Sequence, residues 1–367
     1  MNNQLDQQNI SHKLNQSLLQ RLERLGRQLV EEKGRKLVLM EVCGTHTVAY
    51  ARTGIADLIS DYIDLRSGPG CPICVTHQKD LDMVFSLAGL ENTLIVTFGD
   101  LLRVPGSYTT LEQEIARGGR VQICYSPQEA VETAAQNPAT KVVFIAIGFE
   151  TTAPAIAAAI KLAAHQQLTN FWVYPILKRV PPALKALLLS PIGLDGFILP
   201  GHVATVLGSK GFNFMKNHGY PSVVTGFDSL DLLWGLYNLL KMIEENRVDV
   251  SNAYSHVVKE EGNRQARLLI EECYAIEPVT RWRGLGLIPE SGYTLQPAYS
   301  KFNACLHFAM DVPDTSTDPR CICGPVITGQ SNPHQCPLFG RHCTPSTPVG
   351  PCMVSPEGAC GAYYYYR

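Results

Sequence analysis

The sequence lacks any long apolar run and any block of basic residues, and both absences exclude whole classes of function. No apolar stretch approaches the roughly 18 residues that a membrane-spanning helix requires. Lys and Arg (31 together) nearly balance Asp and Glu (33), and no cluster of them marks a surface for nucleic acid or anionic lipid. The first residues also lack the apolar core of a signal peptide. We therefore expect a cytoplasmic protein that binds neither nucleic acid nor membranes.

The composition is that of a globular protein with more than one domain. Of 367 residues, 45% are hydrophobic and 17% are charged, which excludes disorder as a description of the whole chain. At roughly 150 residues per domain, the length predicts two or three domains.

Cysteine is the residue type whose number and placement are unusual. The chain has 12 cysteines. Six of them lie in the last 47 residues: Cys321, Cys323, Cys336, Cys343, Cys352 and Cys360. A large chain without an export signal does not need disulfides to compensate for a small core. Clustered cysteines in such a chain indicate metal binding or redox chemistry.

Short apolar runs alternate with helical stretches along most of the chain. Residues 12–33 have leucines at helical spacing and end at Gly34, which predicts an amphipathic helix. Eight later runs are expected to be strands: residues 36–41, 62–66, 93–98, 120–125, 141–147, 171–176, 195–199 and 221–225. Apolar strands that alternate with helices indicate parallel sheets covered on both faces, so we expect an α/β fold with two parallel-sheet domains.

This rhythm divides the chain into four predicted segments. An N-terminal helix occupies residues 1–35, and the two α/β domains occupy residues 36–137 and 138–272 with four strands each. Residues 273–367 form a small C-terminal domain. Its last 47 residues contain seven prolines and six glycines and no helical period. Such a segment buries little apolar area, so we expect a metal centre to stabilise it.

Thiols, imidazoles and carboxyls follow five of the predicted strands. They are Cys43 and His46 after the first strand, Cys71 and Cys74 after the second, Asp100 after the third, Glu150 after the fifth and His202 after the seventh. Ligands of open parallel sheets bind beyond the carboxyl ends of the strands, so these residues are candidates for one site.

Cys43 lies between a predicted buried strand and a predicted helix start. A helix N-terminus lowers the pKa of a thiol, and His46 can act as its proton partner. The resulting thiolate would be a nucleophile or a soft ligand for Fe(II). The alternative for Cys43 is a small buried hydrophobe, and for His46 a hydrogen-bonded structural histidine.

Cys71 and Cys74 form a C-x-x-C pair at an expected helix N-terminus. This placement suits a dithiol–disulfide couple, and half of a zinc or iron site is the alternative. No dinucleotide fingerprint, Walker A motif or C-x3-C-x2-C motif is present. Glu150, Asp100 and His202 are acid–base candidates, and each also fits a structural turn or cap. Cys124, Cys273 and Cys305 have no motif around them and are interpreted as packing residues.

The C-terminal cysteines are unevenly spaced, with 14 residues between Cys321 and Cys336, 6 before Cys343 and 16 before Cys360. Zinc sites usually show closely paired cysteines. An iron–sulfur cluster tolerates irregular loop-borne spacing. The spacing favours an iron–sulfur cluster, with zinc as the alternative.

Five motifs and this cysteine spacing resemble the HypD family of hydrogenase maturation proteins. The motifs are MEVCGTHT at residues 40–47, GPGCPIC at 68–74, TFGD at 97–100, GFETT at 148–152 and PGHV at 200–203. The resemblance runs in order from about Leu37 to Gly361.

The resemblance implies a scaffold that assembles the Fe(CN)2CO unit of [NiFe]-hydrogenase together with the small chaperone HypC. Cyanide would come from HypE, with HypF upstream, and the hydrogenase large subunit would be an indirect partner. Cys43 would bind the Fe(II) that carries CN and CO, and Cys71 and Cys74 would be a redox pair near that iron or ligate it in some states. Two further sets are implied: a [4Fe-4S] cluster on Cys321, Cys336, Cys343 and Cys360, and an extra redox pair, Cys323 and Cys352, beside it.

Two other functions remain open from the residues alone. The C-x-x-C pair with a cluster also fits a stand-alone, cluster-dependent thiol–disulfide oxidoreductase. A zinc-stabilised interaction module is the third possibility.

Overall fold

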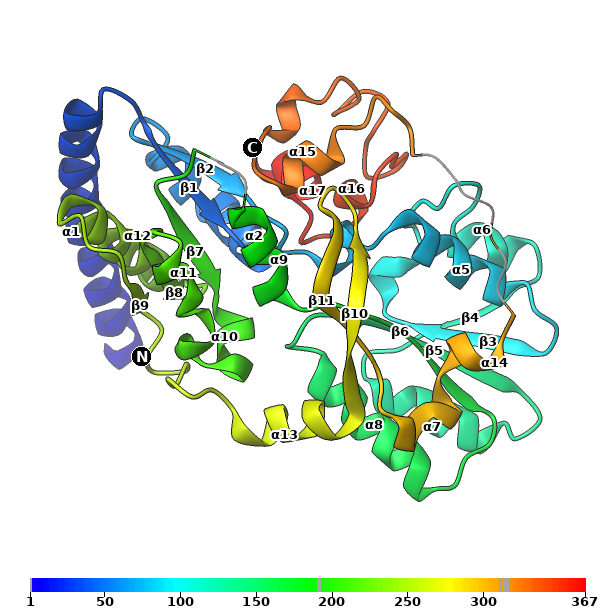
Figure 1. Ribbon diagram of the computed structural model, residues 1–367. Coiled ribbons are helices and arrows are strands. Elements are labelled where there is room, and N and C mark those ends of the chain that lie inside the picture. The colour runs from blue at the N-terminus through cyan, green and yellow to red at the C-terminus, as the bar shows by residue number, and fades with distance from the viewer. Residues whose placement is uncertain (1, 190–192, 310–311, 313–316) are drawn as a thin grey trace.

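The structure is a computed structural model that describes residues 2–189, 193–309, 312 and 317–367, with the backbone alone for residues 2–12. It confirms the predicted α/β fold with two parallel sheets (Figure 1). The N-terminal helix, α1 (Asn2–Lys33), starts ten residues earlier than the leucine pattern indicated. It ends next to Gly34, whose positive φ of 67° suits a glycine at a helix C-terminus.

In the described chain the first sheet has five strands in the order β2-β1-β7-β8-β9, with parallel pairing throughout. Its strands are β1 (Leu37–Glu41), β2 (Ile63–Ser67), β7 (Gly196–Pro200), β8 (Ser222–Thr225) and β9 (Val250–Asn252). The second described sheet has four parallel strands in the order β4-β3-β5-β6. They are β3 (Thr93–Thr97), β4 (Arg120–Ile123), β5 (Lys141–Gly148) and β6 (Phe171–Leu177).

The predicted assignment of four consecutive strands to each sheet, with a division at residues 137/138, is wrong. The chain leaves the first sheet after β2, builds the whole second sheet, and returns to the first sheet at β7. β1 therefore pairs with β7, for example Leu39 with Gly196. Parallel strands pair through long crossovers, and an apolar run does not encode which distant run will become its neighbour.

Alternation of side chains along each strand separates the cores on the two faces. Leu37 and Leu39 of β1 pack into one cluster with α1 and α12 (Ser229–Glu244), whereas Met40 packs into the other. In β5, Phe144 and Val143 likewise point to opposite faces. Since successive strand residues face opposite sides, strands that are apolar throughout must be covered on both faces. The core that contains Met40 and Val143 spans both sheets and joins them.

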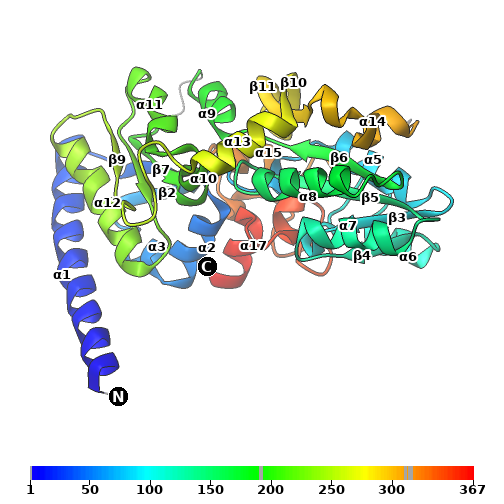
Figure 2. The same cartoon turned by 90° about the horizontal axis from the view of Figure 1, so that it is seen from below.

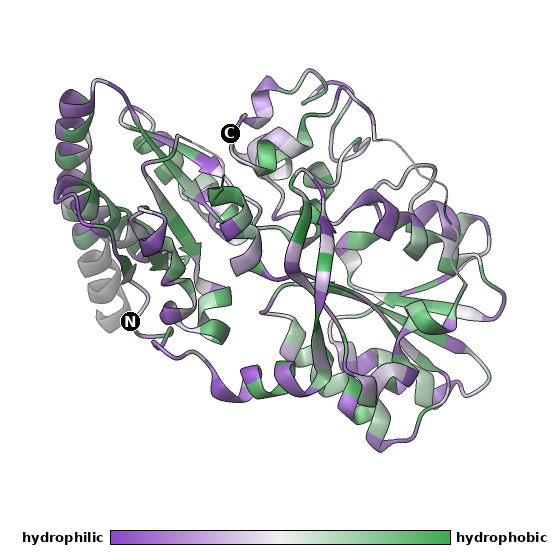
Figure 3. Ribbon diagram, viewed as in Figure 1, coloured by the Kyte–Doolittle hydropathy of each residue, from purple (hydrophilic) through white to green (hydrophobic). Residues whose placement is uncertain are grey.

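Helices cover the sheets. α1 and α12 lie together against one face of the first sheet (Figure 2). Figure 3 shows mainly apolar strands, whereas the described residues of α1 are mainly hydrophilic. The helices not given elsewhere are α2 (Gly44–Arg52), α3 (Ile55–Leu58), α4 (Pro72–Val75), α5 (Gln78–Ala88), α6 (Leu111–Ala116), α7 (Pro127–Gln136), α8 (Ala153–His165), α9 (Val180–Leu188), α10 (Gly201–Leu207), α11 (Phe214–Asn217), α13 (Arg264–Cys273) and α14 (Ala304–His307). Short 3-10 turns are η1 (Gly99–Leu101), η2 (Ser209–Phe212), η3 (Pro297–Phe302) and η4 (Pro333–Gln335).

The C-terminal third contains an antiparallel hairpin that the sequence analysis missed. Its strands are β10 (Tyr274–Trp282) and β11 (Gly286–Leu295). The tip of this hairpin lies against the cysteine-rich segment, which forms the short helices α15 (Cys323–Ile327), α16 (Pro351–Val354) and α17 (Ala359–Tyr366) (Figure 1). Within the described residues, no helix combines the length and apolar character needed to cross a bilayer.

Candidate thiol and metal site

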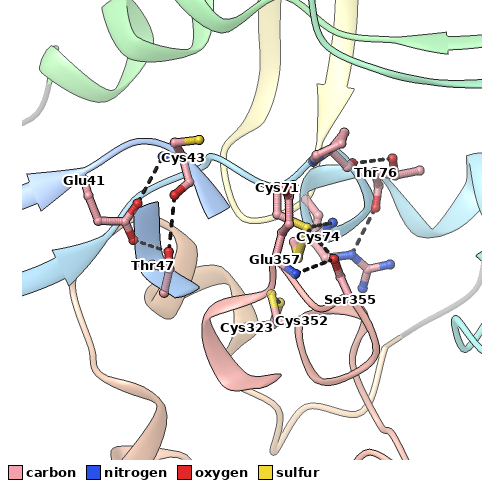
Figure 4. Close-up of a disulfide and its surroundings, with 12 residues drawn as sticks. Glu41, Cys43, Thr47, Cys71, Cys74, Thr76, Cys323, Cys352, Ser355 and Glu357 are labelled. Atoms are coloured by element: carbon pink, nitrogen blue, oxygen red, sulfur yellow. Dashed lines mark hydrogen bonds between the residues drawn. A yellow bond between two sulfur atoms is a disulfide. The ribbon is translucent and has the colours of Figure 1, made fainter. Parts of the chain in front are cut away.

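Three segments that are distant in sequence meet at the carboxyl end of β1. They are the turn from β1 into α2, the segment that leads into α4, and the turn between α16 and α17. Gly44 N–H donates to the Gly70 carbonyl at 3.1 Å, and the Thr45 hydroxyl donates to Glu357 Oε1 at 2.6 Å. Cys71 Sγ lies 3.4 Å from Ser355 Oγ. Figure 4 shows the resulting group, with Cys43 to one side of the Cys71–Cys74 disulfide and the Cys323–Cys352 pair beyond it.

Cys43 is the N-cap residue of α2 and is 7% exposed. The expectation that the helix N-terminus would lower its pKa is wrong. Burial raises the pKa of the Cys43 thiol to about 12, and the carboxylates of Glu357 and Glu41 add to the rise. Desolvation of a thiolate outweighs the helix end, because a helix dipole contributes only about 0.3–1 kcal/mol at an ordinary terminus. The raised pKa favours the protonated form of the Cys43 thiol at neutral pH.

Glu41 is a buried carboxyl directly beneath Cys43. Its Oε2 accepts a hydrogen bond from the Cys43 N–H at 3.0 Å, and its Oε1 accepts one from the Thr47 hydroxyl. Burial raises the pKa of Glu41 to about 8, although these donors oppose the rise. Through its hydrogen bonds Glu41 orients the turn that carries Cys43. Its raised pKa favours a protonated carboxyl next to this turn at neutral pH.

Glu357 is a site residue that the sequence analysis missed. It lies in the turn between α16 and α17, bonds to Thr45 and raises the pKa of Cys43. Gly44 permits this approach, since a Cβ atom there would collide with the Glu357 backbone carbonyl. Glu357 stands only three residues before Cys360, and a carboxylate so near a candidate ligand was the available signal.

His46 and His202 lie on α2 and α10, the helices that follow the neighbouring strands β1 and β7, and both stack on one aromatic ring. Phe227 stacks on His46 at 4.6 Å and on His202 at 4.0 Å between ring centroids. His46 is fully buried with its Nε2 3.0 Å from the Gly226 carbonyl, and burial lowers its pKa to about 4. The neutral imidazole of His46 is hydrogen-bonded to a backbone carbonyl. These contacts are those expected of a hydrogen-bonded structural histidine. His202 remains exposed.

Cys71 and Cys74 are joined by a disulfide, with Cα atoms 5.2 Å apart. Cys71 is the N-cap residue of α4, and its sulfur accepts a hydrogen bond from the Cys74 N–H at 3.2 Å. Gly70, just before it, lies so close to the Cys43 backbone that a Cβ atom would collide with the Cys43 nitrogen. The structure thus places the disulfide beside Cys43.

Cys323 and Cys352 form a second pair, with their sulfur atoms 3.1 Å apart and both side chains buried. The two thiols share a hydrogen bond in which either sulfur could be the donor, and this bond lowers the pKa of Cys323. Cys352 lies on α16, which packs against α4 and its disulfide. α16, which carries Cys352, is therefore adjacent to α4, which carries Cys74 of the disulfide.

The remaining four C-terminal cysteines surround one small cavity. Its lining includes Cys321, Cys336, Cys343 and Cys360, together with Cys323, Cys352 and the apolar residues Val326, Phe339 and Met353. Burial raises the pKa of Cys321 to about 12, and the Cys323, Cys336 and Cys343 thiols contribute to this rise, which reflects their proximity. Gly350 keeps space here, because a Cβ atom would stand 3.1 Å from Cys321 Sγ.

The chemistry of these four residues is compatible with a [4Fe-4S] cluster. Among the described residues no group of three or more His, Cys, Asp or Glu side chains is close enough to hold one metal ion. A cubane binds each thiolate to a different iron, so its sulfur ligands stand farther apart than those around zinc. Four thiols converging on an apolar cavity are the donor set that such a cluster requires.

Glu150 and Asp100 are not brought to Cys43 by any contact of the described chain. Glu150 is buried and accepts the Val180 N–H at 3.0 Å, so it caps α9. Burial raises its pKa to about 7. Asp100 lines a separate hollow of about 450 Å³ with Pro72 and Ile73 of α4.

The three cysteines interpreted as packing residues divide in two. Cys124 and Cys273 are buried in the core on the outer face of the second sheet, as expected. Cys305 is exposed, so its interpretation as a packing residue is wrong.

Comparison with known proteins gives one consistent family. A sequence model named HypD and described as "Hydrogenase formation hypA family" matches residues 14–367. The chain is 42% identical over 335 residues to the hydrogenase maturation factor HypD of Escherichia coli (strain K12), covering 91% of this chain and 90% of that protein. It is 40% identical over 359 residues to the hydrogenase maturation factor HypD of Rhodobacter capsulatus, covering 96% and 95%.

Proposed function

The chain belongs to the HypD family of hydrogenase maturation factors, and from this premise we propose that it is the scaffold on which the Fe(CN)2CO unit of [NiFe]-hydrogenase is assembled. The observation that carries the proposal is the convergence of Cys43, the Cys71–Cys74 disulfide and the C-terminal cysteines on one edge of the first sheet. The iron with its cyanide and carbonyl ligands is the cargo.

Cys43 is the proposed ligand of that iron. Its thiol is buried and protonated, with Glu41 and Glu357 as its nearest carboxyls. A thiol must lose its proton to bind a metal, so Fe(II) binding releases one proton, and a nearby carboxylate such as Glu357 is placed to accept it. Soft thiolate suits the low-spin Fe(II) that strong-field CN and CO ligands need. Cys43 is only 7% exposed, so little solvent reaches its side chain.

Cys71 and Cys74 are the proposed redox pair for this iron. They lie on the segment that contacts the Cys43 turn and carry a disulfide that accepts two electrons on reduction. Cys323 and Cys352 are the corresponding pair next to the cluster cavity. Cys321, Cys336, Cys343 and Cys360 would hold a [4Fe-4S] cluster, which supplies electrons one at a time when bound.

The proposed partners follow the family. HypC would contribute a second ligand to the iron at Cys43, HypE would deliver cyanide made with HypF, and the hydrogenase large subunit would receive the finished unit. We place this work in the cytoplasm. His202 is exposed near Phe227, where an incoming partner has access to it.

Infrared spectroscopy tests the proposal. The full chain co-expressed anaerobically with HypC, in cells with an active maturation pathway, should give a complex with cyanide and carbonyl stretches. Cys43→Ala should abolish those bands while the visible absorption of the cluster persists. Cys124→Ala, a buried cysteine in the other core, is the matched control and should keep both signals. Absence of the bands from the unaltered complex would refute the scaffold role.

A stand-alone thiol–disulfide oxidoreductase is the second candidate. The specific observation for it is the adjacency of two cysteine pairs, since α16 with Cys352 packs on α4 with the disulfide. It predicts steady turnover of a protein disulfide without HypC or a second iron. Metal analysis separates both candidates from a zinc module: four irons and acid-labile sulfide per chain would exclude zinc.

A further inference from the structure

A second, larger pocket opens on the outer side of the Cys323–Cys352 pair. It has a volume of about 600 Å³ and lies between the tip of the β10–β11 hairpin and the start of α15. Its walls include Arg281, Trp282 and Arg283 from the hairpin, Gln78 from α5, and Cys321 and Cys323. Figure 1 shows the hairpin tip next to α15. Volumes of roughly 300–1,000 Å³ are typical of sites for small molecules.

The hairpin tip is held firmly against α15. Gly284 has a positive φ of 77°, and a Cβ atom there would stand 2.7 Å from the Gly324 Cα atom. Arg283 N–H donates to the Val75 carbonyl at 2.8 Å, which ties the tip to α4 as well. The pocket wall that the hairpin tip forms is therefore fixed by the packing of this tip against α15 and α4.

Two arginines line the pocket, and Asp80 lies near enough behind them for Arg281 and Arg283 to oppose the burial-driven rise of its pKa. Arg283 donates through Nε to the Thr76 carbonyl at 3.0 Å and through Nη2 to Gln78 Oε1 at 2.6 Å, so its guanidinium is fixed in place. The Arg281 guanidinium makes no hydrogen bond or ion pair with the described residues. No Asp or Glu is among the described residues that line the pocket. Two guanidinium groups without a lining carboxylate favour an anion, and guanidinium pairs best with carboxylate or phosphate.

Only one sulfur of the pair faces this pocket. Cys323 lines both the outer pocket and the inner cavity of the four cysteines, whereas Cys352 lines the inner cavity alone. Their sulfur atoms are 3.1 Å apart. A disulfide formed between them would therefore present Cys323 to a molecule in the pocket and hide Cys352 behind it.

We propose that this pocket binds a small carboxylate-bearing thiol that reduces the Cys323–Cys352 disulfide by attack on Cys323. This inference deepens the proposed function and rests on it, since it names a source of electrons for the pair. The bound thiolate forms a bond to Cys323 Sγ as the Cys323–Cys352 bond breaks, and Cys352 leaves with the electron pair and takes up a proton. A second molecule of the thiol attacks the sulfur of the first, which releases the small disulfide and Cys323 as a thiolate. Two thiols are oxidised and one protein disulfide is reduced.

The reverse reaction tests the site, because thiol–disulfide exchange is reversible. The anaerobically purified, cluster-containing full chain with Cys352→Ser is mixed with glutathione disulfide, which carries four carboxylates, or with neutral 2-hydroxyethyl disulfide. Acid-quenched samples are analysed by mass spectrometry with peptide mapping. We expect the adduct on Cys323, formed about tenfold faster with the anionic probe after correction for the intrinsic reactivities of the two probes, a ratio that corresponds to one good charge pair.

Charge variants locate the selectivity. Arg281→Gln should reduce the ratio to about threefold or less, and Arg281→Lys should keep part of it, because lysine retains the charge without the bidentate geometry. Raising the salt concentration to about 0.5 M should also reduce the rate ratio of the anionic to the neutral probe, because salt screens the charges. Arg264→Gln, an exposed arginine on α13, is the matched control and should leave the ratio unchanged.

Two results would overturn the proposal. One is that Arg281→Gln and the parent protein prefer the anionic probe over the neutral probe to the same extent. The other is that the adduct forms on another cysteine. If Cys352→Ser does not incorporate the cluster, Cys352→Ala or a rapidly quenched parent protein provides the same adduct map. Failure here would leave the infrared test of the scaffold untouched, so the two proposals are distinguishable.

Discussion

Burial decides the chemistry of the individual residues at this site. Burial raises the pKa of the Cys43 thiol to about 12 and the pKa of the Glu41 carboxyl to about 8. Both groups are therefore protonated at neutral pH, and an arriving cation must displace a proton to bind sulfur.

The first prediction concerns Glu41. Its pKa in the folded chain, about 8, is above its ordinary value of 4.5, so the folded state holds a proton that the unfolded state has lost between these values. Stability therefore falls as pH rises through this window, by at most about 1.4 kcal/mol per pH unit from this group. Glu41→Gln should flatten the decline measured by denaturant unfolding from pH 5 to 8.

Glu91→Gln, at an exposed loop position, is the control for the loss of a carboxyl and should keep the parent's pH profile. An equally steep decline in Glu41→Gln would mean that Glu41 is not the titrating group.

The second prediction concerns Glu357. Its carboxylate contributes to the raised pKa of Cys43, after burial, so Glu357→Gln should increase the thiolate fraction. Alkylation of Cys43 by iodoacetamide at pH 8, followed by peptide mass spectrometry, should become about threefold faster or more, since each unit of pKa changes the thiolate fraction tenfold. Glu290→Gln, on the hairpin, should leave the rate unchanged, and a slower reaction in Glu357→Gln would contradict the assignment.

At the scale of elements, the site depends on close approach between very short segments. α4 and α16 are four residues each, too short to be stable alone, so packing holds them in place. Glycine makes this packing possible at Gly44 and Gly358, where a Cβ atom would collide with the Glu357 and Cys352 carbonyls respectively. Backbone contact, with no side chain between, is what sets the sulfur positions.

The third prediction is that Gly44→Ala loosens the C-terminal segment. The added methyl group collides with the Glu357 backbone, and overpacking of this kind costs about 1–3 kcal/mol. Limited proteolysis should then cleave within residues 317–367 several-fold faster. Gly89→Ala, where the nearest atom is 3.6 Å away, should match the parent chain.

At the scale of the whole molecule, the two sheets share one large core, and the cysteine-rich segment adds only a few buried residues to it: Cys323, Ile327 and Cys352. Residues 317–367 contribute a small cluster of their own around Leu338, Cys343 and Met353. That cluster is too small to offset the entropy of ordering so many residues. A cofactor held by four cysteines would supply the missing stabilisation.

The fourth prediction follows from this division. Removal of iron with a chelator under reducing, anaerobic conditions should make residues 317–367 sensitive to protease, while the thermal transition of the two sheets shifts little. Cys336→Ala should reproduce this behaviour without chelator, and Cys305→Ala, at an exposed cysteine, should not. Simultaneous loss of all structure on iron removal would refute the separation.

The sequence was informative about elements and much less so about partners. Each of the eight predicted strands is present, because apolar runs bounded by Gly and Pro report burial directly. The pairing of β1 with β7 could not be predicted from the sequence, since it depends on contacts between residues more than 150 positions apart. The set of Cys321, Cys336, Cys343 and Cys360, which line one cavity, was implied by the family resemblance. Glu357 was not expected, because a carboxylate in a turn is ordinarily solvated.

The insertion of β3–β6 between β2 and β7 has a consequence for biosynthesis. β1 emerges from the ribosome about 8–30 s before its partner β7, at typical translation rates of roughly 5–20 residues per second. During that interval an apolar strand waits with one edge unpaired, which is a hazard for intermolecular β-pairing. The nascent chain must therefore rely on rapid completion of the inserted sheet, or on a holding chaperone, until β7 arrives.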